Sequence, residues 1–381
     1  MHILIAPNAF KNSVDASAAA EAIERGLRQS ELSFTSQRCP IGDGGDGTAA
    51  LLNAKLGGTL VHAEVHDPLG RIIRSSFGWI DQTKTAIIEL ADASGLRLLT
   101  PEEYNPLRTT TQGCGELIRR ALDQSAAQII LGIGGSATID AGIGILSVLG
   151  IRFLDSRKNE LNNLPEQLDE LASIDIDHLD SRILNTRITV MCDVENYLLG
   201  KQGAAHVFGP QKGASIESIH RLESGLEHFS SITEKLTGQD MRVMLHGGAA
   251  GGVAASLAVF CKAQLVSGID YFLDSTDFNS ALKTANLVIT GEGSIDDQTL
   301  QGKAPFGVAK MAKEQGVPVI ALAGQIPAHP GNELKNYFDE ILSINPQPVN
   351  LEEAIKNTLI NLERTAKLLG ERLNGAKAPR L

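Results

Sequence analysis

Residues 129–142 read Ile-Ile-Leu-Gly-Ile-Gly-Gly-Ser-Ala-Thr-Ile-Asp-Ala-Gly, which is an apolar strand, a glycine-rich turn and a polar helix start in one run. Glycines let a backbone turn sharply and come close to a ligand. Those of this run are Gly132, Gly134 and Gly135. Ser136 and Thr138 would place hydroxyls beside the unpaired N–H groups of the following helix, which favours anion binding. We therefore predict a phosphate-binding loop within a parallel α/β sheet.

Two kinds of ligand fit this loop equally well when it is considered alone. No Gly-Lys-Ser/Thr follows, so it is not a Walker A loop, but Gly132-x-Gly134-x-x-Ala137 matches a relaxed dinucleotide fingerprint. Asp155 follows the next candidate strand, Ile151–Leu154, at about the spacing of a ribose contact. A kinase-like phosphate site and a nicotinamide site therefore both remain open, beside a plain turn that binds nothing.

The overall charge of the chain limits its partners. A formal net charge of −11 disfavours nucleic acids and anionic membranes, which need a basic surface. An anionic substrate would have to be held by a few local cations. The 381 residues exceed what one hydrophobic core usually holds, so two domains are expected.

Cysteine spacing and the apolar segments favour a cytoplasmic protein. The four cysteines are scattered and lack the Cys-x-x-Cys spacing of metal or redox sites. The N-terminal apolar run has no basic lead or cleavage site, so we interpret it as a first strand. The apolar stretch Gly247–Leu257 is too short to span a bilayer.

Alternating strand and helix patterns at both ends of the chain predict a Rossmann-like three-layer α/β/α domain with a mainly parallel sheet. The expected strands are His2–Ala6, Asn286–Thr290, Val317–Ala323 and Glu340–Ile344. The expected helices are Ser17–Gln29, Phe306–Gln315 and a long closing helix over Leu351–Leu373. We expect this domain to comprise residues 1–56 and 284–381.

The middle of the chain, residues 57–283, predicts an inserted mixed α/β domain, with the active site in the cleft between the two domains. Its first expected strands resemble antiparallel ribbons joined by short turns. They are Leu60–Val65, Arg71–Ile80 and Thr85–Leu90. Thr186–Met191 is a further strand, and the polar stretch Ser156–Ser181 is expected to be a loop or a peripheral helix.

Polar side chains and glycines gather at the expected strand ends. Lys11 follows the first strand, and Asp43 and Asp46 lie in a run with four glycines in residues 42–47. These two aspartates are candidate partners for Mg²⁺ or a substrate hydroxyl, although Asp46 would equally cap a helix. Asp140 is expected either to serve the loop at 129–142 or only to complement a helix dipole.

The later segments supply carboxylates and cations. Asp193 follows a strand and can orient a substrate hydroxyl or hold a metal, or else open a turn. Lys212 is presented by a rigid turn. Glu292 and Asp296 flank a short glycine-containing segment, with the cation Lys303 nearby, which suggests a nucleotide–Mg²⁺ wall. Lysines, carboxylates and backbone amides are what phosphoryl transfer requires.

Taken in chain order, these segments resemble the bacterial type I glycerate kinase family over nearly the whole length. The shared pieces are Ala-Pro-x-x-Phe-Lys at 6–11, Asp-Gly-Gly-x-Gly-Thr at 43–48, Asp-Pro-Leu-Gly at 67–70, Glu-x-Ala-x-Ala-Ser-Gly-Leu at 89–96, Asn-Pro-Leu-x-Thr-Thr at 105–110, Gly-Ile-Gly-Gly-Ser-Ala-Thr at 132–138, Cys-Asp-Val at 192–194, Phe-Gly-Pro-Gln-Lys-Gly-Ala at 208–214, Gly-Ala-Ala-Gly-Gly at 248–252, Thr-Gly-Glu-Gly at 290–293 and Gly-Lys-Ala-Pro at 302–305. The resemblance implies phosphorylation of D-glycerate by ATP with Mg²⁺, usually at the 2-hydroxyl.

Under this hypothesis each candidate residue receives a role. The catalytic candidates are Asp193, Lys11 and Lys212. The nucleotide- and phosphate-binding candidates are Gly132, Gly134, Gly135, Ser136, Thr138, Gly291, Gly293 and Lys303. The substrate-binding candidates are Asn8, Asp43, Arg71 and Arg108, and the Mg²⁺ candidates are Glu292 and Asp296. The implied partner is glycerate, and a homo-oligomer stays open.

The chain departs from the usual family pattern at several positions. Asn8-Ala9 stands where the family has Asp-Ser, and Ser294 where it frequently has Arg. Asn8 loses the negative charge but keeps hydrogen-bonding capacity. The departures suggest a shifted substrate or a weakened, ligand-binding protein as an alternative to the kinase, beside an NAD-dependent dehydrogenase. The other departures are Ile139, Ala141 and Glu195.

Overall fold

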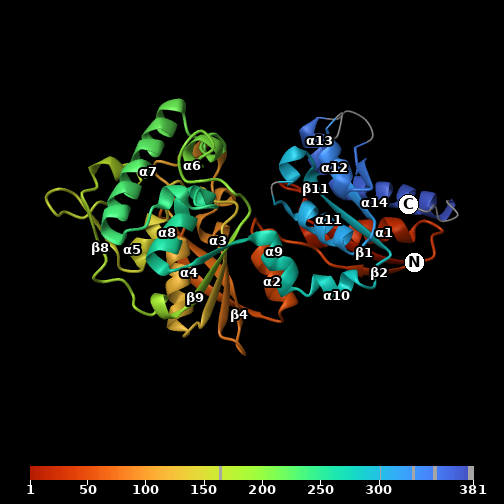
Figure 1. The fold of residues 1–381 in the computed structure, drawn as a ribbon, viewed down its shortest axis with the longest axis horizontal. Helices are drawn as coiled ribbons and strands as arrows, with labels where there is room; N and C mark the ends of the chain where they lie inside the picture. The colour runs from red at the N-terminus through yellow and green to blue at the C-terminus, as the bar shows by residue number, and fades with distance from the viewer. Residues whose placement is uncertain (163–164, 301, 328–330, 346–349, 376–381) are drawn as a thin grey trace. The chain divides into compact units, whose positions relative to one another are not determined.

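A computed structural model describes residues 1–162, 165–300, 302–327, 331–345 and 350–375 (Figure 1). The chain forms two compact units. The first combines both chain ends, Met1–Asp43 and Ile269–Leu381, and the second is the continuous segment Gly44–Gly268.

The junctions between the units lie earlier in the chain than positions 56 and 283, where the sequence pattern places them. Helix α2 (Thr48–Lys55) packs on strands β4 (Ile72–Ile80) and β5 (Thr85–Glu89), so it joins the second unit. At the other junction Ile269 belongs to the first unit, because its side chain lies against Gly307 of helix α11 (Ala304–Glu314). These are tertiary contacts, which the local sequence pattern does not contain.

The first unit holds a fully parallel five-stranded sheet in the order β13-β12-β11-β1-β2. Its strands are β1 (His2–Pro7), β2 (Thr35–Arg38), β11 (Leu287–Ser294), β12 (Val319–Gln325) and β13 (Glu340–Ser343). Its helices are α1 (Ala16–Arg28), α9 (Gly268–Ser275), α10 (Phe278–Leu282), α11 (Ala304–Glu314), α12 (Asn332–Tyr337), α13 (Leu351–Lys356) and α14 (Thr358–Gly375). The α/β class and the parallel sheet expected from the sequence are therefore present.

Helices cover the two faces of this sheet because strand residues alternate between them. On one face α1 and α14 pack together over a core that includes Ile3, Ile289 and Leu322. Their close approach needs Gly26, where a Cβ would lie 2.1 Å from the carbonyl oxygen of Glu363. Helix α11 contacts β11 and β12, and its buried residues lie outside that core cluster. The result is the expected three-layer arrangement.

The second unit holds a mixed six-stranded sheet in the order β10-β9-β6-β5-β4-β3. Its strands are β3 (Thr59–His66), β4, β5, β6 (Gln128–Gly132), β9 (Arg187–Cys192) and β10 (Gln264–Ser267), with β7 (Arg152–Leu154) and β8 (Ser173–Asp175) paired separately. Its helices are α2, α3 (Ala91–Ser94), α4 (Gln112–Asp123), α5 (Ile143–Val148), α6 (Ala204–Phe208), α7 (Ile216–Thr237) and α8 (Val253–Cys261). Within the six-stranded sheet β3, β4 and β5 pair antiparallel, as the sequence predicts, and its other strands pair in parallel, while β7 and β8 pair antiparallel.

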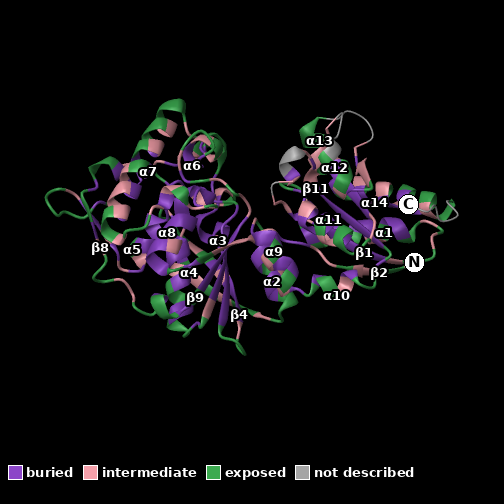
Figure 2. Ribbon diagram, in the orientation of Figure 1, coloured by how far each residue is buried: buried purple, intermediate pink, exposed green. Residues whose placement is uncertain are grey.

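Burial follows the sheets in each unit, and Figure 2 shows their central strands in the buried colour. Every residue of β5 is buried, as are the last four of β6 and the last five of β9. Such continuous apolar runs are typical of sheets covered on both faces. The carboxyl ends of these strands are therefore held rigidly by the core beneath them.

Three expected elements differ from the structure. The long closing helix is divided at Asn357 into α13 and α14. The stretch Ser156–Ser181 contains the short strand β8, with residues 163–164 outside the described part. Strand β11 does not stop at Thr290 but continues to Ser294, because β12 pairs beside it as far as Gln325.

Candidate active site

In the second unit, three of the singled-out segments meet at one edge of the sheet. Glu89 at the end of β5 is the register partner of Gly132 at the end of β6, and Gly132 is in turn the partner of Met191 in β9. Asp193 follows β9 directly. Since ligands of parallel α/β sheets bind outside the carboxyl ends of the strands, this edge is the place to look for a site.

Two glycine-rich segments pack backbone against backbone at this edge. The Gly134 N–H donates to the carbonyl of Gly44 at 2.9 Å, and a Cβ on Gly134 would lie 2.4 Å from the Cα of Gly45. Gly135 has φ +70°, and a Cβ there would meet the Asp46 carboxylate at 2.6 Å. These glycines therefore allow residues 44–46 of the same unit to pack closely on the loop.

The helix after this loop begins later than the sequence suggests. Helix α5 starts at Ile143, so Ser136 and Thr138 do not lie at its first turn, and that expectation is wrong. Asp140 is buried, and its carboxylate accepts hydrogen bonds from the backbone N–H groups of Thr111, Gly142 and Gly144 and from the Thr111 hydroxyl. Burial raises the Asp140 pKa, while these hydrogen bonds oppose the rise. Asp140 thus stabilises the helix start.

Lys212 is tied to the glycine loop. Its ammonium donates to the Ser136 hydroxyl and to the Thr138 carbonyl, both at 2.7 Å, and the side chain is only 3% exposed. Burial lowers the Lys212 pKa to about 7, while the charges of Asp140 and Asp193 oppose that change. The structure therefore unites two sequence-predicted elements, the loop and this lysine, in one buried contact.

Asp193 lies at the same place. A Cβ built on Gly134 would be 3.1 Å from Asp193 Oδ2, and the Asp193 charge acts on Lys212. A carboxylate, an amine of lowered pKa and a loop of backbone amides are thus grouped within the second unit. This combination can hold an anionic group and orient a hydroxyl.

Glu89 belongs to this edge, although no role was expected for it. It is 3% exposed, and its two carboxylate oxygens accept from the backbone N–H groups of Gly47, at 2.7 Å, and Ala49, at 3.1 Å. Burial raises the Glu89 pKa to about 7, and nearby Asp92 adds to the rise. The sequence signal that could have identified Glu89 is an acidic residue at the end of a short, mainly apolar strand.

In the first unit, the ends of β1 and β11 bring Asn8 and Asp43 together. The Asn8 N–H donates to the Gly291 carbonyl at 2.8 Å, and Asn8 Nδ2 donates to Asp43 Oδ2 at 2.9 Å. A Cβ on Gly291 would lie 2.1 Å from the carbonyl oxygen of Leu322, so this glycine allows close strand packing. At Gly293 the nearest atom to such a Cβ is the backbone nitrogen of Lys11, at 3.5 Å, and the Lys11 side chain is exposed.

Glu292 lies within β11 rather than after it and is 8% exposed. Its Oε1 accepts from the Thr299 hydroxyl at 3.1 Å. Burial raises the Glu292 pKa to about 8, Lys303 opposes the rise, and Asp43 and Asp296 add to it. The predicted carboxylates and the predicted lysine of this unit are therefore electrostatic neighbours.

The two arginines expected to bind substrate are placed differently. The Arg71 guanidinium donates from Nε to Asp67 at 2.5 Å and from Nη1 to Glu103 at 2.6 Å, so carboxylates of the protein already hold it. Arg108 is exposed, while the neighbouring Thr109 hydroxyl donates to the Ala137 carbonyl at 2.9 Å. The segment carrying Arg108 is thus connected to the glycine loop, whereas Arg71 lies within a separate ion-pair cluster.

Asp155, the residue that favours a nicotinamide site in the sequence, has a different role in the structure. Asp155 follows β7, a strand outside the six-stranded sheet, and its carboxylate accepts from the N–H groups of Arg157 and Asn159 and from the Asn159 side chain. These hydrogen bonds lower its pKa. Asp155 therefore stabilises a local turn.

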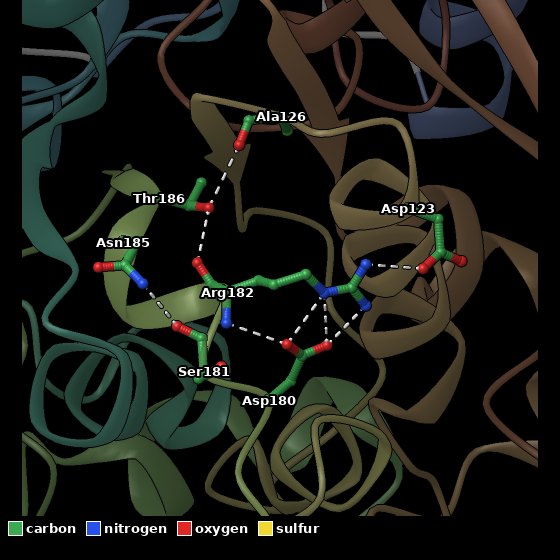
Figure 3. Close-up of polar contacts among 7 residues, drawn as sticks. All are labelled: Asp123, Ala126, Asp180, Ser181, Arg182, Asn185 and Thr186. Carbon is green, nitrogen blue, oxygen red and sulfur yellow. Dashed lines mark hydrogen bonds and ion pairs between the residues drawn. The ribbon is translucent and has the colours of Figure 1, made fainter.

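Arg182 and its partners, which lie near the amino ends of β6 and β9, also have a structural role (Figure 3). Arg182 Nη1 donates to Asp123 at 3.1 Å and Nη2 to Asp180 at 2.7 Å. The Thr186 hydroxyl, just before β9, donates to the carbonyls of Ala126 and Arg182. These contacts connect the segments that precede β6 and β9.

Metal-binding clusters and membrane-spanning helices are both absent from the described ranges. No group of three or more His, Cys, Asp or Glu side chains there is arranged to hold a metal ion. Of the helices in that part of the chain, none combines the length and the apolar character needed to cross a membrane.

The molecule is thus of the α/β class in which small ligands bind outside the carboxyl ends of parallel strands, and the glycine-rich turns and lysines at those ends suit an anionic ligand. The sequence model of the glycerate kinase family matches residues 3–374, and the chain belongs to this family. It is 44% identical over 377 residues to a glycerate kinase of Bacillus subtilis (strain 168), covering 99% of each chain. It is 40% identical over 367 residues to a glycerate 2-kinase of Escherichia coli (strain K12), covering 96% of each.

A solved structure shares the fold. The crystal structure described as a putative glycerate kinase 2 from Salmonella typhimurium LT2 matches with a TM-score of 0.82 and 42% sequence identity, covering 99% of both chains. The family resemblance expected from the motifs is therefore confirmed, and the dehydrogenase hypothesis is not supported.

Proposed function

We propose that this protein transfers the γ-phosphoryl group of ATP to the 2-hydroxyl of D-glycerate with Mg²⁺. Membership of the glycerate kinase family supports the acceptor, and the E. coli relative named glycerate 2-kinase supports the choice of hydroxyl. The observation that carries the proposal is the buried contact between Lys212 and the loop of Ser136 and Thr138, with Asp193 beside it.

In the proposed reaction the second unit holds the phosphoryl group. The loop Gly132–Thr138 binds nucleotide phosphates through amides other than those of Gly134 and Ala137, which donate to the carbonyls of Gly44 and Ser94. Lys212 fixes the shape of that loop. Asp193 orients the glycerate hydroxyl for attack, since a carboxylate at hydrogen-bonding distance can accept its proton. Arg108 is a candidate for the glycerate carboxylate, and the assignment of Arg71 is weakened by its contacts with Asp67 and Glu103.

The first unit supplies the groups that fit Mg²⁺. Mg²⁺ is usually bound by one or two carboxylates together with substrate phosphates and water. Glu292 and Asp296 would provide that donor set. Burial is the main cause that raises the Glu292 pKa to about 8, the charges of Asp43 and Asp296 add to the rise, and a bound cation would oppose it. When bound, the metal neutralises phosphate charge. Lys11, Lys303, Asn8 and Asp43 complete the proposed set.

A coupled assay of ADP release tests the proposal directly. The panel comprises D-glycerate, L-glycerate, glycolate and D-lactate, each with ATP and Mg²⁺, and NMR of the product distinguishes 2-phosphoglycerate from 3-phosphoglycerate. We expect turnover with D-glycerate and the 2-phospho product. Lack of turnover with every acid would refute the kinase, and the 3-phospho product would refute the choice of hydroxyl.

A weakened, ligand-binding protein is the second candidate, motivated by Asn8. Its side chain does not replace a metal-binding carboxylate but donates to Asp43 and accepts from the Ala9 N–H. Calorimetry with ATP and glycerate decides between the two functions, because binding of both without product would favour the ligand-binding protein. We propose the cytoplasm as the location, where ATP and a reduced environment for the four cysteines are supplied.

A further inference from the structure

Glu89 connects the segments of the candidate site in the second unit. It ends β5, next to Gly132 in the sheet register. One of its carboxylate oxygens accepts from the N–H of Gly47, just before α2, and the other from the N–H of Ala49 in the first turn of α2. Helix α2 has Gly47 at its N-cap in a left-handed conformation, without a side-chain cap of its own. A distant carboxylate thus supplies the acceptors that the first N–H groups of a helix need.

The turn held by Glu89 is the one that packs on the glycine loop. Its Gly44 carbonyl accepts from the Gly134 N–H, and a Cβ on Gly44 would lie 2.8 Å from the Met191 carbonyl oxygen at the end of β9. A continuous set of hydrogen bonds therefore runs from Glu89 through residues 44–49 to the loop that carries Ser136.

Charged neighbours keep Glu89 in this role. Asp92 and Asp46 lie close enough for their charges to act on it. Arg97 donates to Asp92, and its Nε lies 3.6 Å from Asp46 Oδ1. Arg97 therefore pairs with the carboxylates of Asp92 and Asp46, and the Glu89 carboxylate stays paired with backbone N–H groups.

We propose that Glu89 is a positioning residue of the phosphoryl-transfer site, which orders residues 44–49 and through them the loop 132–138. The predicted effect on KM rests on the proposed function, whereas the predicted ordering of residues 44–49 by Glu89 does not. A disordered turn must be ordered again when substrate binds, and that cost raises KM.

The test compares Glu89→Gln with the wild type at pH 8. Glutamine keeps the shape but offers one acceptor oxygen and turns an amide donor toward the second N–H. We expect hydrogen exchange in the peptide over residues 44–52 to accelerate at least tenfold, with β6 unchanged. We expect kcat/KM to fall at least tenfold, mostly through KM, with kcat within about threefold of the wild type.

Glu64→Gln is the matched control, because Glu64 is an exposed glutamate on β3 of the same unit. It should leave exchange and kinetics unchanged. A general loss of folded enzyme would instead lower kcat at constant KM and accelerate exchange throughout the unit, and this result would overturn the proposal. Unchanged exchange in residues 44–52 would overturn it too. If the wild type does not phosphorylate glycerate, the proposed function fails while the exchange result still decides the role of Glu89.

Discussion

Asp193 is the residue on which the proposed chemistry depends most. It follows a buried strand, lies against Gly134 and acts electrostatically on Lys212. We expect Asp193→Asn to lower kcat by two or more orders of magnitude with little change in ATP affinity, because an amide orients a hydroxyl but does not accept its proton. Steady-state kinetics and nucleotide titration measure the two effects.

Asp155→Asn is the control for this substitution. Asp155 also follows a strand, but its carboxylate only holds a turn. Near-normal turnover of the Asp193 variant would remove that residue from the mechanism.

Lys212 is expected to act through the loop it holds. In Lys212→Met the Ser136 hydroxyl loses its partner and the Thr138 carbonyl loses a donor, and a buried polar group left unsatisfied costs about 1–3 kcal/mol. We expect the affinity for ATP, measured by calorimetry, to fall at least tenfold. The exposed Lys201→Met should bind ATP normally. Equal affinities for ATP in the two variants would show that the loop does not need Lys212.

At the scale of elements, the two packed glycine-rich segments leave no room for a side chain. In Gly134→Ala the new Cβ would lie 2.4 Å from the Gly45 Cα, and overpacking of this kind typically costs about 1–3 kcal/mol. We expect a loss of kcat/KM together with a lower free energy of unfolding. Trp79, the single tryptophan, is buried in β4 and reports the unfolding of this unit by fluorescence.

Gly238→Ala separates this collision from the ordinary cost of replacing a glycine. Gly238 ends α7 with φ +74° and has nothing within 4 Å of an added Cβ. It should cost about 1 kcal/mol from backbone conformation alone, with normal kinetics. If Gly134→Ala and Gly238→Ala have the same kcat/KM and the same free energy of unfolding, the packing of residues 44–46 on the loop does not contribute to function.

The strands could be predicted from the sequence, but the contacts between distant segments could not. The apolar runs before Gly132 and Asp193 predict β6 and β9 correctly, because burial on both faces demands continuous apolar residues. The start of α5 was missed, since the acceptor that fixes it, Asp140, is joined to Thr111 at a separation of 29 residues. Periodicity reports which face is buried but not which distant backbone a carboxylate reaches.

The site shows the same division between local and distant information. The sequence indicates Lys212 and the loop of Ser136 and Thr138 separately, and the structure brings them into contact. The sequence pattern predicts no role for Glu89, because its partners Gly47 and Ala49 lie some 40 residues earlier in the chain. Arg71 stays a predicted substrate-binding residue, although its contacts with Asp67 and Glu103, which the sequence does not indicate, weaken that prediction.

At the scale of the molecule, buried acids make stability depend on pH. Burial raises the Glu89 pKa from 4.5 to about 7, so the folded state binds this proton more tightly than the unfolded chain. The stability gained from this tighter proton binding is complete below pH 4.5 and is lost as the pH rises through about 7, while the hydrogen bonds from Gly47 and Ala49 continue to hold the ionised carboxylate. The rise corresponds to at most about 3 kcal/mol.

The comparison of Glu89→Gln with the wild type measures this contribution. Glutamine does not titrate, so unfolding free energies from Trp79 fluorescence should shift in favour of the variant by up to about 3 kcal/mol between pH 5 and pH 8. Glu64→Gln should show no such trend. A difference between Glu89→Gln and the wild type that does not vary with pH would exclude Glu89 as the titrating group.

The order of the strands in the first unit also sets an order for biosynthesis. Strand β1 pairs with β11 and β2, and Ile3 is the register partner of Leu287. At translation rates of 5–20 residues per second, the apolar β1 waits about 15–60 s before β11 is synthesised. The second unit is continuous from Gly44 to Gly268 and can be completed within that time. One side of β1 can thus pair early with β2, whereas its other side stays unpaired until β11 is made, so an apolar strand edge is exposed during synthesis for that interval.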